Sequence, residues 1–301
     1  PKTSTTRSKK NSSHRLTKLC AEATSGFPKN LMELPHFLFC DLHPMPTIIL
    51  SDFIKATQNL ALEEWLLRDA DLPLPYLVLY RNRSSVVLGR NQNVWMECNP
   101  DWLKKRNIAL VRRISGGGTV YHDMGNSNFT LITTRRDYEP GRHTALATSL
   151  LDHHGLSVTT CHRQGIYHEG RKISGSAFKL TGKRALQHAT LLFNTNFDRL
   201  LASIQPLIGD QQAAAKGIPS IRSTVRNLQE IDPTLNHAWF TDRITRLFKH
   251  QYGHDTTTYR TNEIAPAIDT YENPLHTWEW TYAKTPPFTL TLPASDSNAH
   301  N

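Results

Sequence analysis

Three consecutive glycines are the feature of this 301-residue sequence that most suggests chemistry. They lie in the segment Arg112-Arg-Ile-Ser-Gly-Gly-Gly-Thr-Val-Tyr-His-Asp123, between two runs with strand character. Glycine loses more conformational entropy on ordering than other residues, and a turn that only reverses the chain needs one or two. Glycines are useful where backbone N–H groups must approach an anion without an intervening Cβ atom. The segment therefore predicts a loop that cradles an anionic ligand, with a plain flexible turn as the alternative.

Basic side chains flank this loop and recur in a second strand-like segment. Arg112 and Arg113 precede the glycines, and because strand side chains alternate, only one should point toward the loop's ligand. The second segment is Gly170-Arg-Lys-Ile-Ser-Gly-Ser-Ala-Phe-Lys179. If it is one continuous strand, Lys172 shares a face with the even-numbered serines that follow it. This pattern predicts the wall of a ligand site, although a single lysine also suits a solvated face.

Several common site chemistries are excluded by their missing motifs. The sequence has no G-x-x-x-x-G-K-[ST], no G-x-G-x-x-G and no G-x-S-x-G pattern, so P-loop, dinucleotide-binding and serine hydrolase sites have no support. The four cysteines form no C-x-x-C pair, and no H-E-x-x-H pattern occurs. We therefore predict no dedicated metal site, and by itself His188 is better explained as a hydrogen-bonded core residue.

The net charge of +9 does not indicate a nucleic-acid-binding protein. Residues 1–29 hold seven of the 35 Lys and Arg residues but one of the 26 acidic residues, so the remaining chain is nearly balanced. Its apolar runs are far shorter than the roughly 18 residues that a membrane-spanning helix needs. We expect no nucleic-acid partner and no membrane span. Scattered cysteines also favour a reducing compartment.

The two ends of the chain differ in composition from the centre. Residues 1–35 are predicted to be a disordered leader, because the first thirty are rich in Ser, Thr, Lys and Arg and lack an apolar segment. This composition is typical of a mitochondrial transit segment, and a plain polar tail is the alternative. Residues 291–301 are predicted to be a disordered tail.

The centre predicts a mixed α/β (α+β) fold. Helix formers predict a helix over 59–68 that ends before Pro73, and Asn99 followed by Pro100 predicts another helix start. Apolar runs at 76–81 and 85–89 predict a hairpin. Further strands are expected at 108–113, 127–134, 172–179 and 184–193, and further helices at 143–154, 197–204 and 239–251. We expect a mixed, largely antiparallel sheet with helices packed on it.

In order along the chain, these segments resemble the lipoate-protein ligase A family, which includes mitochondrial lipoyltransferases. The resemblance covers about residues 50–290 and involves seven motifs: Asn59 to Glu64, Gly89-Arg-Asn-Gln-Asn93, Arg112 to Asp123 with Gly125-Asn126, Arg171-Lys-Ile-Ser-Gly-Ser-Ala177, His188 to Leu192, Ile221-Arg-Ser223 through Asn227-Leu228, and Trp278-Glu-Trp-Thr-Tyr-Ala-Lys-Thr-Pro286. Each motif is weak alone, whereas seven in the same order are highly specific. The resemblance implies a catalytic domain over residues 45–290 with the class II synthetase-like sheet shared by biotin protein ligases.

The resemblance also implies a reaction in two halves. Lipoate and ATP form lipoyl-AMP and pyrophosphate, with Mg²⁺ expected as a cofactor, and the lipoyl or octanoyl group then passes to a lysine of an acceptor domain. The implied acceptors are the lipoyl domains of 2-oxoacid dehydrogenase E2 subunits and the glycine cleavage H protein. The implied cellular location is the mitochondrion in a eukaryote and the cytoplasm otherwise.

Site residues are implied by the same resemblance. Lys172 would be the catalytic lysine, between the acyl carbonyl oxygen and the phosphate, and Leu60 and Leu62 would line the acyl tunnel. The residues implied to bind lipoyl-AMP or ATP are Arg113, Ser115, Gly116, Gly117, Gly118, Thr119, Val120, Tyr121, His122, Lys179 and His188.

Departures from the family pattern leave alternatives open. Gln164-Gly165 stands where relatives commonly have an acidic residue, Lys179 where they usually have arginine, and Ala189 where they have glycine. The chain also ends soon after the Trp278 motif, so we expect the small C-terminal accessory domain of many relatives to be absent. Three functions therefore compete: a lipoate-protein ligase or lipoyltransferase, a biotin-type protein ligase, and a catalytically degenerate protein that binds acceptor domains.

Overall fold

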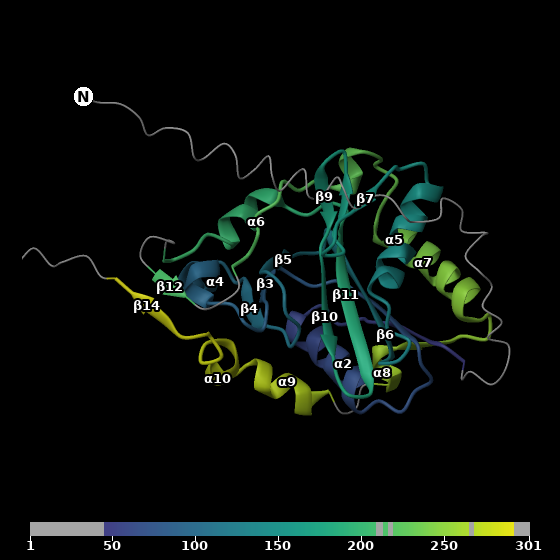
Figure 1. Ribbon diagram of the computed structural model, residues 1–301, viewed down its shortest axis with the longest axis horizontal. Coiled ribbons are helices and arrows are strands. Elements are labelled where there is room, and N and C mark those ends of the chain that lie inside the picture. Colours follow the sequence, from purple (N-terminus) through teal and green to yellow (C-terminus); the bar gives the residue numbers. More distant parts are fainter. Residues whose placement is uncertain (1–44, 209–212, 216–218, 265–267, 292–301) are drawn as a thin grey trace, which may run out of the picture.

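A computed structural model describes residues 45–208, 213–215, 219–264 and 268–291 (Figure 1). The predicted leader, residues 1–35, lies outside these residues, as does all of the predicted tail except residue 291. The mitochondrial location that rests on the leader therefore stays a prediction. Within the described ranges, no helix has the length and apolar character needed to cross a membrane.

A six-stranded mixed sheet forms the centre of the fold and confirms the predicted fold class. Its order is β10-β11-β6-β2-β1-β13, with antiparallel pairing from β10 to β2 and parallel pairing from β2 to β13. The strands are β1 (Thr47–Leu50), β2 (Tyr76–Tyr80), β6 (Asn126–Thr134), β10 (Ser176–Leu180), β11 (Arg184–Leu192) and β13 (Thr257–Arg260).

Three smaller sheets surround this one. They comprise β3 (Ser85–Leu88), β4 (Ala109–Arg112) and β5 (Val120–His122); β7 (Thr159–Thr160), β8 (Ile166–His168) and β9 (Arg171–Ser174); and β12 (Ala213–Ala215) with β14 (Phe288–Leu290). The hairpin predicted over 76–89 is wrong, because β2 belongs to the large sheet and β3 pairs with β4 and β5. Both strands are buried throughout, so their apolar pattern does not reveal which partner each one takes.

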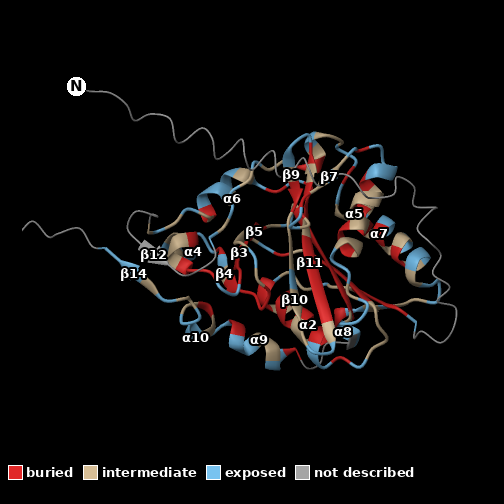
Figure 2. Cartoon of the chain, in the orientation of Figure 1, coloured by how far each residue is buried: buried red, intermediate tan, exposed pale blue. Residues whose placement is uncertain are grey.

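Helices cover both faces of the large sheet, and buried residues run through its central strands (Figure 2). On one face, α5 (Pro140–His153) and α7 (His237–Tyr252) bury a cluster with Phe129 and Leu191. On the other face, α2 (Ala56–Arg68) packs with Ile132 and Leu186. The remaining helical segments are α3 (Val94–Glu97), α4 (Pro100–Lys105), α6 (Phe197–Ser203), the short turn Leu228–Glu230, α8 (Thr261–Ile264), α9 (Asp269–Leu275) and α10 (Trp278–Thr281).

The strand predicted over 172–179 is divided in two by Gly175. Before Gly175, β9 pairs with β8, and after it β10 pairs with β11 at the edge of the large sheet. The division changes the predicted faces: a Cβ atom at Gly175 would lie 3.4 Å from the Lys172 Cε atom, so the lysine lies on the face of Gly175. Lys172 therefore does not share the face of Ser176 and Phe178, as one continuous strand would require.

Two buried histidines, His122 and His143, and the half-buried His237 make the fold sensitive to acid. Burial lowers the pKa of His122 and of His143 to about 3, and that of His237 to about 4. Each histidine is therefore neutral in the folded chain, whereas the unfolded chain takes up these protons near pH 6.5. Because the unfolded state then binds more protons, this stability is complete above about pH 6.5 and is lost as the pH falls toward the folded pKa values.

We predict that acid lowers the free energy of unfolding by about 1.4 kcal/mol per pH unit for each such histidine below about pH 6.5. The His143 ring stacks on Phe129 at a centroid distance of 4.5 Å. His143→Phe keeps this stacking but cannot take up the proton, so its stability should depend less steeply on pH. Urea unfolding of both proteins at several values between pH 7 and pH 5 measures the two slopes, and equal slopes would contradict the prediction.

Candidate active site

The guanidinium of Arg113 is bound inside the glycine loop, which joins β4 to β5. Its Nη2 atom donates to the carbonyl oxygens of Gly116 at 2.6 Å and Gly118 at 2.8 Å, and its Nη1 atom donates to Val87 at 3.0 Å. Burial lowers the pKa of Arg113 to about 10, and the nearby Glu63 carboxylate opposes this shift. The guanidinium therefore stays charged at neutral pH. Of the two arginines, Arg113 is the one that bonds to the glycine loop; that only one of them points toward a ligand stays a prediction.

Arg112 forms its hydrogen bonds with a neighbouring segment instead. Its side chain is fully buried and donates to the carbonyl oxygens of Gly89, Arg90 and Gln92, and to Thr281 of α10. This guanidinium joins the 89–92 turn to the C-terminal part of the chain. Both arginines thus hold backbone in place, and a direct contact of Arg113 with a ligand stays a prediction.

The carbonyl groups that point at Arg113 also determine where the loop's N–H groups point. In a trans peptide the N–H is directed opposite to the preceding C=O. The N–H groups of Gly117 and Thr119 therefore face away from the guanidinium. Gly117 has a φ angle of 86°, which favours glycine, and no described residue accepts a hydrogen bond from its N–H. Of these two outward N–H groups, the one of Gly117 has no acceptor among the described residues and suits an anionic ligand, whereas the one of Thr119 donates to Ser220 Oγ.

A buried chain of polar side chains links this loop to α2. Ser115 Oγ lies 2.8 Å from His188 Nε2, and His188 Nδ1 lies 2.9 Å from Glu63 Oε2. A nucleophile, a base and an acid show this geometry in hydrolases. Here, however, Ser115 is 0% exposed and its oxygen already accepts from Arg113 Nε at 2.9 Å. The chain of bonds therefore connects the buried cation to the buried Glu63 carboxylate and does not present a nucleophile.

The amine of Lys172 lies on the same face of the sheet edge as the loop. A Cβ atom at Gly175 would lie 3.5 Å from Lys172 Nζ, and one at Gly117 would lie 3.4 Å from Ala177 Cβ. Gly175 and Ala177 are two residues apart along the strand, about 7 Å. The lysine amine and the glycine loop are therefore neighbours across a short gap, although 55 residues separate Lys172 from Gly117 in sequence.

Lys172 is half-buried, and no described residue forms a hydrogen bond or ion pair with its amine. Burial lowers its pKa, the Cys161 thiol opposes this shift, and Arg163 adds to it. Its backbone bonds to the 224–226 segment through Lys172 N to Thr224 O at 2.8 Å and Arg226 N to Lys172 O at 3.0 Å. The amine is thus positioned by the strand but lacks an anionic partner within the described chain.

Ser220 forms hydrogen bonds to the loop, and it is not among the site residues predicted from the sequence. Its hydroxyl accepts from the Thr119 N–H at 2.8 Å and from Gln92 Nε2 at 2.9 Å, and donates to Glu97 in a short hydrogen bond. A Cβ atom at Gly118 would lie 3.0 Å from this hydroxyl. Ser220 therefore occupies one of the loop's two outward donors. Its neighbour, the Ile221-Arg-Ser223 motif, was the only sequence signal close to it.

The other predicted site residues lie in three different surroundings. Thr119 belongs to the loop and bonds Gln92 at 2.7 Å, and Lys179 lies on the strand face of Ala177, two residues farther from the loop. Val120 is half-buried against the α2 cluster that also holds Leu60 and Leu62. Tyr121 and His122 point elsewhere: the Tyr121 hydroxyl bonds Ser84 at 3.2 Å, and His122 bonds Asn82 at 3.0 Å. Ligand contact by these residues stays a prediction.

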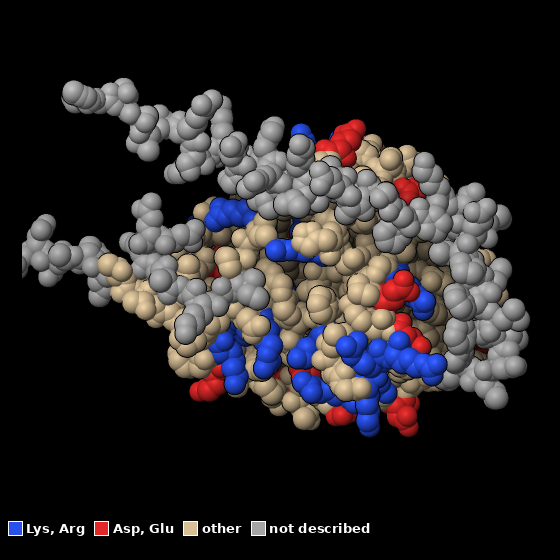
Figure 3. Space-filling view, in the orientation of Figure 1, with Lys and Arg blue, Asp and Glu red and all other residues tan. Residues whose placement is uncertain are grey.

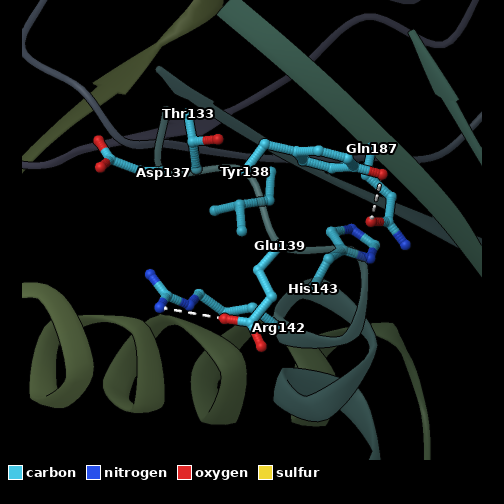
Figure 4. A pocket seen from close by; sticks show the side chains of 8 residues that line it. Thr133, Asp137, Tyr138, Glu139, Arg142, His143 and Gln187 are labelled. Atoms are coloured by element: carbon cyan, nitrogen blue, oxygen red, sulfur yellow. Dashed lines mark hydrogen bonds and ion pairs between the residues drawn. The ribbon is translucent and has the colours of Figure 1, made fainter. Parts of the chain in front are cut away.

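A cavity on the opposite face of β11 is separate from this site. It measures about 10 Å³ and is lined by residues that include Tyr138, His143 and Gln187 (Figure 4). Gln187 and His188 are adjacent on β11 and therefore point to opposite faces. The volume suffices for about one water molecule. The cavity therefore has no room for a substrate.

Comparisons with known proteins agree on one family. The sequence model for the lipoyl protein ligase A/B catalytic domain matches residues 55–249. A lipoate-protein ligase A from Psychrobacter cryohalolentis is 35% identical over 240 residues, which cover 77% of this chain and 70% of the relative. The crystal structure of P. falciparum LipL1 in complex with lipoate superposes with a TM-score of 0.68 at 28% identity, covering 80% of this chain and 75% of that one. A lipoate-protein ligase A bound with ATP shares the fold, with a TM-score of 0.60 at 23% identity over 79% of this chain and 98% of that one.

The close approach of Gly89 to the loop gives a test of the loop's geometry. A Cβ atom at Gly89 would lie 2.0 Å from the Gly117 carbonyl oxygen, whereas one at Gly116 would meet nothing within 4 Å. We predict that Gly89→Ala costs about 1–3 kcal/mol of stability because backbone must move, and that Gly116→Ala costs less than about 1 kcal/mol. Thermal and urea unfolding measure both, and equal costs would contradict this packing.

Proposed function

The chain belongs to the lipoyl protein ligase A/B family of enzymes, and on this premise we propose that it transfers a lipoyl or octanoyl group through an acyl-AMP intermediate to a lysine of acceptor lipoyl domains. One observation supports this most strongly: a Cβ atom at Gly175 would lie 3.5 Å from the Lys172 amine, and a Cβ atom at Gly117 would lie 3.4 Å from Ala177 Cβ, two residues farther along the chain. The amine and the glycine loop therefore approach the same short stretch of the sheet edge.

The proposed site must overcome the electrostatic repulsion between its two anionic substrates. A carboxylate and a phosphate repel each other, so forming their mixed anhydride requires fixed donors and positive charge where the bond forms. Lys172 supplies the charge and Gly117 an N–H donor without a Cβ atom. The glycine loop and the Lys172 backbone are both held by hydrogen bonds, so the N–H donor and the segment that carries the amine need little rearrangement during the reaction.

In the first half-reaction, a carboxylate oxygen of the fatty acid attacks the α-phosphorus of ATP. A P–O bond forms, the bond to the β-phosphate breaks, and pyrophosphate leaves. In the second, the neutral amine of the acceptor lysine attacks the acyl carbon. The new C–N bond replaces the C–O bond to phosphate, AMP leaves as an anion, and the amine releases a proton. Lys172 would stabilise the charge on the acyl oxygen and on the departing phosphate.

Magnesium ion has few protein ligands available here. Among the described residues, no three or more His, Cys, Asp and Glu side chains are placed to hold a metal ion. At residue 165, where relatives commonly have an acid, a glycine faces the Lys172 side chain. These residues do not fit a dedicated metal site, so no step of the proposed mechanism passes through one. Magnesium would instead be held mainly by the phosphates of ATP.

We predict that Lys172→Ala lowers acyl transfer by roughly 30-fold to 1,000-fold, because removing one such donor costs about 2–4 kcal/mol of transition-state stabilisation. Lys172→Arg, which keeps a charge in a different shape, should retain part of the activity. The measurement is mass spectrometry of an acceptor lipoyl domain after incubation with lipoate plus ATP, or with lipoyl-AMP. Wild-type rates in a folded Lys172→Ala variant would remove this residue from the mechanism.

The missing acid at residue 165 generates a separate prediction. A Cβ atom there would lie 3.4 Å from Lys172 Cε and 3.2 Å from the Tyr167 ring, so an aspartate fits with a small shift. Its carboxylate would favour the charged lysine. We expect Gly165→Asp to speed the reaction from lipoate and ATP severalfold more than transfer from lipoyl-AMP. Gly165→Asn is the uncharged control, and an equal effect of both variants would show that charge is not the missing element.

A further inference from the structure

The edge strand β10 has an open side. In the large sheet β11 is its one strand neighbour within the described residues. All five residues from Ser176 to Leu180 are at least partly exposed, and Phe178 is 55% exposed. Exposed edges present unpaired backbone groups that can bind a strand of another chain.

The backbone bonds at the two ends of β10 show which groups face this open side. The Gly175 oxygen accepts from Thr190 N at 3.0 Å, and Thr181 N donates to Arg184 O at 2.9 Å. In an antiparallel pair, alternate residues bond to the partner strand. The odd-numbered residues of β10 therefore bond to β11, and the N–H and C=O groups of Ser176, Phe178 and Leu180 point to the open side.

This open edge begins at the candidate active site. Ala177 lies next to Gly117. Gly175 is the residue directly before β10, and it lies next to the Lys172 amine. A strand paired with β10 would therefore pass beside the gap between the amine and the loop. A side chain at the end of this added strand that is closer to Lys172 would reach the gap while the pairing of β10 with β11 stays intact.

Side chains along the edge favour an acidic partner. Phe178 packs near Tyr138 with a centroid distance of 6.3 Å and leaves an aromatic surface exposed. At the far end, Arg135 N donates to Lys183 O at 2.7 Å, so the basic residues of the β6 end and the β10–β11 turn are adjacent. Lys and Arg side chains gather over this part of the surface, with a few acids among them (Figure 3). In sequence, the β6 end and the β10–β11 segment carry Arg135, Arg136, Lys179 and Lys183, of which all but the half-buried Lys179 are exposed, and the nearest acids are Asp137 and Glu139.

We propose that β10 is the docking edge for the acceptor domain, which adds an extended, lysine-bearing strand to the sheet and directs acidic side chains toward Lys183. This inference rests on the proposed function and names the surface that its protein substrate uses. A second copy of the chain fits less well, because pairing of two β10 strands would bring like charges together. Main-chain hydrogen bonds would supply affinity, and the basic end would select the partner.

A proline at Phe178 tests the backbone bonds. Its N–H points away from β11, so Phe178→Pro removes an outward donor without breaking a bond to β11. With synthetic lipoyl-AMP and a purified E2 lipoyl domain, we expect the acceptor KM to rise at least tenfold. Phe178→Ala keeps the donor and should raise it less. Transfer of the acyl group to hydroxylamine, which needs no docking, should stay within twofold for both variants.

A charge reversal provides a second measurement that does not depend on the proline variant folding. Lys183→Glu should raise the acceptor KM severalfold, with the effect shrinking at high salt. Lys104→Glu, on an exposed part of α4, changes the net charge equally and should leave this KM unchanged.

The outcomes separate docking from chemistry. An unchanged acceptor KM in folded Phe178→Pro and Lys183→Glu, with hydroxylamine transfer intact, would overturn the docking proposal alone. A dimer of the chain that Phe178→Pro abolishes, with the acceptor KM unchanged, would assign the edge to a second copy and would also overturn it. Failure of the wild-type chain to acylate either hydroxylamine or the lipoyl domain would instead refute the proposed function on which the docking proposal rests.

Discussion

The buried guanidinium of Arg113 orients the peptide groups of the glycine loop, and the site depends on this interaction. Its donors hold the carbonyl oxygens of Gly116 and Gly118 on one side. Because each peptide is planar, the following N–H groups are held on the other side. Glycine is needed for close approach at two of the three positions, because a Cβ atom at Gly117 would lie 3.0 Å from the Arg113 guanidinium and one at Gly118 would lie 3.0 Å from the Ser220 hydroxyl. In the proposed site, this buried cation thus orients the backbone donors that would meet an anionic ligand.

Burying that cation requires a buried counter-charge, and the fold provides one from a distant helix. Glu63 of α2 reaches Arg113 through His188 and Ser115, and its other oxygen accepts from Tyr80 at 2.9 Å. A buried charge left without partners is strongly destabilising, so these residues belong to one structural unit. The unit joins α2, β11 and the glycine loop, and β11 in turn positions β10 and the segment that holds Lys172.

Sequence reasoning succeeded where the signal was local and failed where it depended on distant partners. The helix predicted over 59–68 is found at 56–68, and the strand predicted over 184–193 is found at 184–192, because local sequence defines both over many residues. The pairing of β2 and β3 was wrong because both are short, fully buried apolar strands. The three-residue β5 was missed, and the break at Gly175 reversed the expected face of Lys172. The glycine loop and the lysine were identified from residue type, but the roles of Arg113 and Ser220 depend on contacts that no local pattern contains.

The central claim is that the Lys172 amine and the Gly117 N–H hold one acyl–phosphate group between them. The most direct measurement is a crystal structure of the full chain with a non-hydrolysable lipoyl-AMP analogue. The account predicts that oxygens of the acyl–phosphate linkage lie within about 3 Å of both Lys172 Nζ and the Gly117 nitrogen. An analogue bound elsewhere, with the Lys172 amine in solvent and the loop donors unused, would contradict it.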